Sequence, residues 1–281
     1  MKKLIGLSLA LIVAASMVTA APKGNLKVAG STTVLPLSQA WAEAYMSKNP
    51  NASISVSGGG TGTGISMLLN GTCEIANASR EAKASEIGSA RNRNSKMVAT
   101  KLAKDGLAVI VNPASNVKNL TMAQIDSIYS GKVSNWDQVG GTSKSRIVVV
   151  GRDSSSGTYG FFQEAVLGGS AYRKDMLSMP SNAAVAQAVS QSKDAIGYVG
   201  MAYADEFAQS GKVHILSISR KHGQAGMKPT KETVASGEYP LFRYLYSYTL
   251  GSPRGLAGDF LKFCTSKEGQ SMVEKAGYIE L

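Results

Sequence analysis

The chain has few of the residues on which metal, redox and most hydrolytic chemistry depends. Of its 281 residues only two are histidine, His214 and His222, and two are cysteine, Cys73 and Cys264. These four residues have no recognised metal-binding spacing, and neither histidine lies in a motif that supplies a general base. We therefore expect no metal site, no cofactor and no enzymatic activity. Whether the cysteines form a disulfide stays open, because spacing does not prove proximity.

Long apolar runs are also scarce. The one that is present covers residues 4–18, follows Lys2 and Lys3, and leads into a small-residue cleavage site that ends at Ala20. This pattern predicts a secretory signal peptide over residues 1–20, and the absence of a cysteine at the cleavage point argues against a lipid anchor. No other run approaches the roughly 20 apolar residues that span a bilayer. We expect a soluble, monomeric protein of the periplasm.

Acidic residues are outnumbered. The chain has 30 Lys and Arg against 19 Asp and Glu, which gives a formal net charge of +11. An excess of positive charge favours anionic ligands. Nucleic acid is not indicated, because the basic residues form no stripe with interleaved aromatic side chains.

The most informative stretch is residues 152–158, Arg-Asp-Ser-Ser-Ser-Gly-Thr. A β-branched run precedes it and an amphipathic run follows it, which predicts a strand, a turn and the start of a helix. Arg152, Ser156, Gly157 and Thr158 would place a guanidinium, hydroxyls and backbone N–H groups at a helix N-terminus, where partial positive charge favours an anion. For this stretch alone, an ordinary Ser-capped helix is the simpler interpretation.

Three other predicted strands end in similar groups. Residues 26–29 lead into a hydroxyl-rich turn, residues 54–56 lead into a glycine-rich stretch at 57–64, and residues 74–78 lead into a Ser-Arg pair. The glycine-rich stretch fits neither the dinucleotide-binding nor the P-loop pattern. A flexible hairpin there, and a plain salt bridge at the Ser-Arg pair, are the alternatives. The candidate ligand-binding residues are Ser31, Thr32, Thr33, Thr61, Ser79, Arg80, Arg152, Ser156, Gly157 and Thr158.

Alternating strands and helices predict an α/β protein with mostly parallel sheets flanked by helices and with its ligand at the carboxyl ends of the strands. The length suits two domains. A Pro-containing break after residue 111 and an aromatic run from residue 239 predict a discontinuous first domain of residues 21–111 and 239–281, and a second domain of residues 112–238. Trp41 should lie in the core, and Trp136 nearer the surface of the second domain.

Taken together, these motifs resemble the phosphate-binding protein of bacterial high-affinity ABC phosphate transporters. The matching segments are residues 30–33, 58–64, 78–80, 128–131 with 135–136, and 152–158, so the resemblance covers essentially the whole mature chain. It implies a two-lobed periplasmic-binding-protein fold of the second type. It also implies that the lobes close over inorganic phosphate in the interdomain cleft and deliver it to an ABC membrane permease.

One position departs from the pattern of well-known members of that family. They carry Ser-Asp where this chain has Ser79-Arg80, and the resemblance implies that their aspartate accepts a proton from phosphate and so rejects sulfate. Another acceptor is then required, for which Asp153 is the candidate and Glu81 a poorer one. The alternative ligands are other tetrahedral oxyanions, namely sulfate, molybdate or tungstate.

Overall fold

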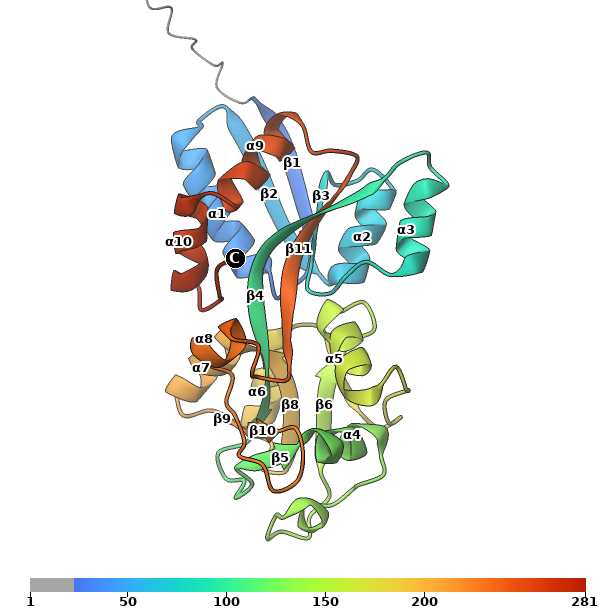
Figure 1. Ribbon diagram of the computed structural model, residues 1–281, viewed down its shortest axis with the longest axis vertical. Coiled ribbons are helices and arrows are strands. Elements are labelled where there is room, and N and C mark those ends of the chain that lie inside the picture. The colour runs from blue at the N-terminus through green and yellow to red at the C-terminus, as the bar shows by residue number, and fades with distance from the viewer. Residues whose placement is uncertain (1–22) are drawn as a thin grey trace, which may run out of the picture.

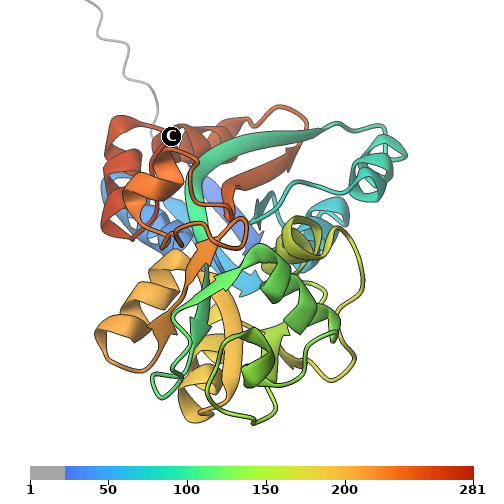
Figure 2. The same cartoon turned by 60° about the horizontal axis from the view of Figure 1, so that its bottom comes forward.

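The computed structural model describes residues 23–281, and the predicted signal peptide lies outside them. Two lobes are stacked one on the other and joined by two long strands (Figure 1). The first of these strands is β4 (Met97–Val111) and the second is β11 (Phe242–Leu250), and they lie side by side in both views (Figure 2). Among the helices of the described residues, none has the length and apolarity needed to cross a bilayer.

The upper lobe is formed by both ends of the described chain. Its other elements are β1 (Gly24–Gly30), α1 (Leu35–Lys48), β2 (Ala52–Gly59), α2 (Thr61–Leu69), β3 (Ile75–Ala78), α3 (Ala84–Arg91), α9 (Gly255–Cys264) and α10 (Lys267–Lys275).

The lower lobe is formed by the middle of the chain. Its elements are β5 (Asn119–Thr121), α4 (Met122–Ser130), a 3-10 turn η1 (Trp136–Val139), β6 (Val148–Arg152), α5 (Gly157–Leu167), β7 (Leu177–Met179), α6 (Asn182–Gln191), β8 (Ala195–Gly200), α7 (Met201–Gln209), β9 (His214–Ile215), β10 (Ser217–Ser219) and α8 (Lys231–Ala235).

One sheet runs through both lobes in the order β2-β1-β3-β11-β4-β8-β6-β7. Strands β1, β2 and β3 pair in parallel, as do β6, β7 and β8, while β4 and β11 run antiparallel to their neighbours. Strand β4 pairs with β11 up to Gly106 and with β8 from Leu107 onward. The α/β prediction is confirmed. The domain division at residue 111 stays a prediction.

Each lobe has its own hydrophobic core, and each core contains one of the two tryptophans. Trp41 is 1% exposed in the upper core, as predicted. The prediction for Trp136 is wrong: its ring is 3% exposed in the lower core, and its indole N–H donates to the Asp194 carbonyl at 3.1 Å. The 3-10 turn folds this residue inward, and only long-range packing determines that.

Local signals mark both ends of α4. Thr121 caps the helix, and Gly131 ends it in the left-handed conformation with φ of 85°. After β3, helix α3 begins at Ala84, following Lys83. Further along the chain, β9 and β10 are short neighbouring strands that pair in different sheets.

The two cysteines are not bonded to each other. Cys73 and Cys264 are buried free thiols in separate hydrophobic clusters. Burial raises the pKa of the Cys73 thiol to about 11. Both therefore act as small apolar core residues.

Candidate anion site between the lobes

The N-termini of α2 and α5 meet across the interface between the lobes. The Gly62 N–H donates to the Ser155 carbonyl at 2.8 Å, and the Ser155 hydroxyl oxygen lies 3.1 Å from the Gly59 carbonyl oxygen. A Cβ at Gly60 would lie 2.8 Å from the Ser155 carbonyl oxygen, so the glycines let two backbones approach closely. The flexible-hairpin alternative is wrong, because the stretch is a strand end followed at once by a helix.

Three predicted site residues from both lobes meet at the start of α5. A Cβ at Gly157 would lie 2.2 Å from the Thr61 hydroxyl oxygen and 2.6 Å from the Ser79 hydroxyl oxygen. Thr61 and Ser79 are almost fully buried, and the Ser79 N–H donates to the Thr61 hydroxyl at 3.1 Å. The Ser79 hydroxyl itself has no partner among the described residues, so it is free to bind a ligand oxygen.

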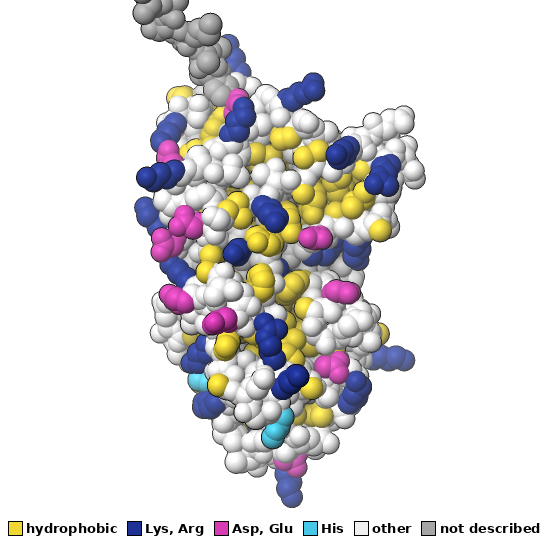
Figure 3. Space-filling view, viewed as in Figure 1, with side chains coloured by type: hydrophobic (Ala, Val, Ile, Leu, Met, Phe, Trp, Pro, Cys, Tyr) yellow, Lys and Arg dark blue, Asp and Glu magenta, His cyan; other side chains and the backbone are white. Residues whose placement is uncertain are grey.

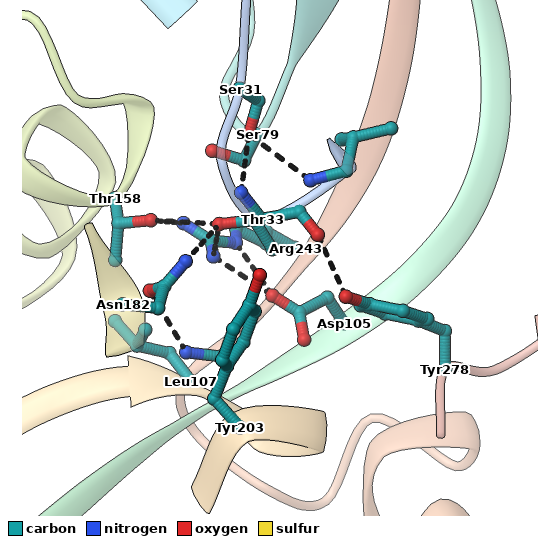
Figure 4. A network of polar contacts seen from close by, with 12 residues as sticks. Ser31, Thr33, Ser79, Asp105, Leu107, Thr158, Asn182, Tyr203, Arg243 and Tyr278 are labelled. Carbon is teal, nitrogen blue, oxygen red and sulfur yellow. Dashed lines mark hydrogen bonds and ion pairs between the residues drawn. The ribbon is translucent and has the colours of Figure 1, made fainter. Parts of the chain in front are cut away.

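A second pair of hydroxyls lies across the same interface. The hydroxyl oxygens of Thr33, from the upper lobe, and Thr158, from the lower lobe, are 3.2 Å apart. Figure 4 shows Thr33 at the centre of a polar network that reaches Thr158, Asn182 and Arg243. The structure therefore brings Thr33 and Thr158 together, although 125 residues separate them in the chain.

Two predicted contacts accept hydrogen bonds from nearby backbone N–H groups. The Ser31 hydroxyl accepts from the Thr33 and Val34 N–H groups at 3.2 and 3.4 Å, in the turn before α1. The Ser156 hydroxyl accepts from the two N–H groups that follow Gly157, at 3.1 and 3.3 Å, and is the N-cap of α5. Ser31 thus orders a turn, and Ser156 caps a helix. Whether either hydroxyl also touches a ligand stays a prediction.

Thr32 lies at the edge of the same cluster. It is partly exposed, and its carbonyl accepts from the Tyr203 hydroxyl of the lower lobe at 2.9 Å. Burial raises the pKa of Tyr203 to about 12, so the phenol stays a donor at neutral pH. This contact is a further bond between the lobes.

Arg152 carries a buried charge that no carboxylate neutralises by hydrogen bonding. Its side chain is 1% exposed, Nε donates to the Met179 carbonyl at 3.1 Å, and Nη2 donates to the Pro180 carbonyl at 3.0 Å. Nη1 has no partner among the described residues, and the Asp153 carboxylate comes no closer than 3.9 Å to Nη2. Burial lowers the pKa of Arg152. A buried cation of this kind favours a bound anion.

Arg80 differs, because its charge is balanced within its own lobe. Nη1 and Nη2 form a two-pronged pair with Glu86 at 2.8 Å each, and Nη1 also donates to the Glu81 carbonyl at 2.8 Å. The aliphatic stem packs on Gly160 of α5. This geometry fits the salt-bridge alternative, and a direct role for Arg80 in ligand binding stays a prediction that the geometry does not favour.

The two candidate proton acceptors are also occupied by neighbours. Oδ1 of Asp153 accepts from the N–H and the hydroxyl of Ser155, so this carboxylate organises the turn before α5. The exposed Glu81 accepts from the Tyr246 hydroxyl at 3.2 Å. Their roles as acceptors for ligand protons remain untested predictions.

Sequence reasoning missed a buried ion pair on the two connecting strands. Arg243 of β11 donates to Oδ2 of Asp105 on β4 from Nε at 3.1 Å and from Nη2 at 2.8 Å, and both side chains are at most 4% exposed. Burial raises the pKa of Asp105, and Arg243 opposes that rise. The available signal was a charged residue inside each apolar run, since charged side chains are almost never fully buried unless paired.

Comparison with known proteins places the chain in a family. The model of the PBP superfamily domain matches residues 16–268. The phosphate-binding protein PstS of Pseudomonas aeruginosa is 35% identical over 274 residues, which cover 92% of this chain and 83% of the relative. The PstS of Bacillus subtilis is 34% identical and covers 91% of this chain and 80% of the relative.

Solved structures agree. A candidate phosphate ABC transporter substrate-binding protein from Clostridium perfringens, with bound phosphate, superposes with a TM-score of 0.82 at 31% identity, over 92% of this chain and 100% of that chain. An ABC-type phosphate transport receptor from Vibrio cholerae superposes with a TM-score of 0.73 at 29% identity, over 91% of this chain and 100% of that chain.

The fold and the interlobe site define a two-lobed substrate-binding protein of the PBP superfamily. Within that class, the chain belongs to the family of PstS phosphate-binding proteins. The predicted family and the predicted two-lobed fold of the second type are both confirmed.

Proposed function

We propose that this chain captures inorganic phosphate between its lobes and delivers it to an ABC-type membrane permease. The observation that carries the proposal is Arg152, a buried guanidinium that has, among residues 23–281, one N–H edge without a partner and no hydrogen-bonded carboxylate. Within the same residues, the buried Ser79 hydroxyl of the opposite lobe also lacks a partner. A small tetrahedral oxyanion would satisfy both groups with charge-assisted hydrogen bonds.

The lobes supply complementary halves of the site. The upper lobe contributes hydroxyls at the ends of β1, β2 and β3, and the lower lobe contributes Arg152 and the N-terminus of α5. Only a closed arrangement presents both halves to one ligand, so an anion stabilises closure by its differential affinity. Strands β4 and β11 are the connections about which the lobes would move. With several charge-assisted bonds, we expect a Kd of about 1 μM or lower.

Phosphate is favoured over other oxyanions by the relatives. The PstS proteins are named for phosphate, and the Clostridium perfringens structure contains it. Sulfate, molybdate and tungstate are therefore not favoured. How sulfate is rejected is a separate question, because Asp153 and Glu81 both have other partners.

We further propose that the protein acts in the periplasm as a monomer and without catalysis. The relatives are named as binding or transport proteins rather than enzymes. The Lys and Arg side chains on the face drawn in Figure 3 are spread over both lobes among acidic residues, which fits the absence of a nucleic-acid partner. A permease partner is proposed because the related structures are named as a substrate-binding protein and a receptor of ABC-type phosphate transport.

The test is isothermal titration of phosphate-stripped protein with phosphate, with and without excess sulfate. We expect tight 1:1 binding that sulfate does not weaken. Competition by sulfate would support the same binding site but a different or less specific ligand. The absence of saturable binding to any oxyanion would contradict the proposal and favour a structural role for the fold.

A further inference from the structure

Arg243 lies where the two lobes and the two connecting strands meet. It projects from β11, is 4% exposed, and is held by Asp105 of β4 through two hydrogen bonds to one carboxylate oxygen. It donates from Nη1 to the Thr158 hydroxyl at 3.0 Å and from Nη2 to the Thr33 hydroxyl at 3.3 Å. One guanidinium thus contacts a site hydroxyl from each lobe (Figure 4).

The hydrogen bonds determine the direction in which Thr33 donates. A threonine hydroxyl has one proton and two lone pairs. Thr33 Oγ1 accepts from Asn182 Nδ2 at 3.1 Å and from Arg243 Nη2, so both lone pairs are occupied. The Asn182 amide is oriented by its own carbonyl oxygen, which accepts from the Gly200 N–H at 3.4 Å. In the 3.2 Å contact with Thr158, Thr33 must therefore be the donor.

The same count determines what Thr158 can do. Its Oγ1 accepts from Thr33 and from Arg243 Nη1, which occupies both of its lone pairs. Among the described residues, the hydroxyl proton of Thr158 is then the one proton in this series of hydrogen bonds that has no acceptor. Thr158 is the second residue of α5 and follows Gly157, which abuts the hydroxyls of Thr61 and Ser79.

We propose that Arg243, held by Asp105, is a positioning residue that makes the Thr158 hydroxyl an obligate donor to the bound anion. This inference rests on the proposed function. Arg243 acts through Thr158 rather than on the ligand itself. Because the chain of donors includes Thr33 from the upper lobe and Thr158 from the lower lobe, it forms only when the lobes are closed, and so it ties recognition of the anion to closure.

The test is a double-mutant cycle read by phosphate titration. Arg243→Lys keeps the charge beside Asp105, but an ammonium cannot replace three guanidinium nitrogens at once. We expect it to weaken phosphate binding about 10-fold in the wild-type background and equally in Thr158→Ser, which keeps the hydroxyl. In Thr158→Val the same substitution should change affinity less than about 2-fold, since the group through which it acts is gone.

The controls separate the ways in which this test can fail. Arg173→Lys alters another buried arginine of the lower lobe, one that is paired with Asp175, and should leave phosphate affinity unchanged. Should Arg243→Lys not fold, Thr33→Val breaks the chain at its other donor and should show the same dependence on Thr158. An equal loss in all three Thr158 backgrounds would overturn the inference. Failure of the wild-type protein to bind phosphate would instead overturn the proposed function.

Discussion

The strand ends at β3 and β6 both carry a serine and an arginine, yet the structure uses the two arginines differently. At β3, Arg80 is paired on both prongs with Glu86 of the same lobe. At β6, Arg152 is bonded to two carbonyls and keeps one N–H edge without a partner among the described residues. A carboxylate that accepts hydrogen bonds from the guanidinium, more than the arginine itself, decides whether such a residue balances charge within the fold or attracts a ligand.

The largest loss of phosphate affinity is expected for Arg152→Ala. Removing this cation, which has no hydrogen-bonded carboxylate among the described residues, should weaken phosphate binding by about 2–3 kcal/mol, or roughly 30- to 150-fold, because the desolvated anion loses its charged partner. Isothermal titration measures the change, and thermal unfolding monitors the loss of the two carbonyl bonds. An affinity within threefold of wild type would show that Arg152 is not the residue that holds the ligand.

Gly157→Ala tests whether the two halves of the site must meet. The added methyl would lie 2.2 and 2.6 Å from two buried hydroxyl oxygens of the upper lobe, so closure should be blocked. We expect affinity to fall at least about 10-fold while thermal stability barely changes, since alanine suits a helix better than glycine. Gly88→Ala on α3, which has open space around it, is the matched control. Phosphate-induced compaction of the variant, seen by small-angle scattering, would refute the blocked-closure explanation.

Arg80→Ala tests the second arginine of the comparison, the one paired with Glu86. Because Glu86 already balances this arginine, its removal should change phosphate affinity less than about 3-fold, and Glu86→Ala should behave similarly. Titration of both variants beside Arg152→Ala gives the contrast directly. A loss at Arg80 as large as the loss at Arg152 would restore the sequence-based prediction that Arg80 binds the ligand.

The smallest effect is expected at Asp175, which pairs with a third arginine, Arg173, away from the candidate anion site. Asp175 accepts from Arg173 and Arg146 at its surface position, and these bonds hold its pKa below its usual range. A lowered carboxyl pKa adds stability that is present above the unfolded pKa of about 3.9 and is lost as the pH falls below it. Asp175→Asn should therefore destabilise the protein by less than about 1 kcal/mol at pH 7.

That difference should shrink in acid. The thermal unfolding temperatures of the Asp175→Asn variant and the wild type should draw closer as the pH falls below about 4, the unfolded pKa, and phosphate affinity at neutral pH should be the same for both. A difference in stability that persists or grows in acid would show that the carboxylate is not stabilised by its arginines.

Most of the elements, and several of the residues that meet between the lobes, could be predicted from the sequence because local chemistry determines them. Periodic apolar residues, the cap at Thr121 and the glycine at Gly131 locate helices and their ends. Hydroxyls and glycines after parallel strands gather at the carboxyl edge of their own lobe. Thr33 and Thr158 meet because these two edges face each other across the interface.

What the sequence could not reveal depends on partners distant in the chain. Arg243 and Asp105 are 138 residues apart, and nothing local in either strand indicates that they pair. Trp136 is buried because its indole reaches a carbonyl 58 residues away. The pairing of Arg80 with Glu86 spans only six residues, but it depends on where α3 begins, and the structure places that start at Ala84.

The most direct test of the central claim is a crystal structure of the phosphate complex. We expect Arg152 Nη1 and the Ser79 hydroxyl each to lie within about 3.2 Å of oxygens of one phosphate, with Arg80 still paired with Glu86. A phosphate bound by Arg80, with Arg152 bonded only to carbonyls, would contradict the assignment of Arg152 as the anion-binding residue.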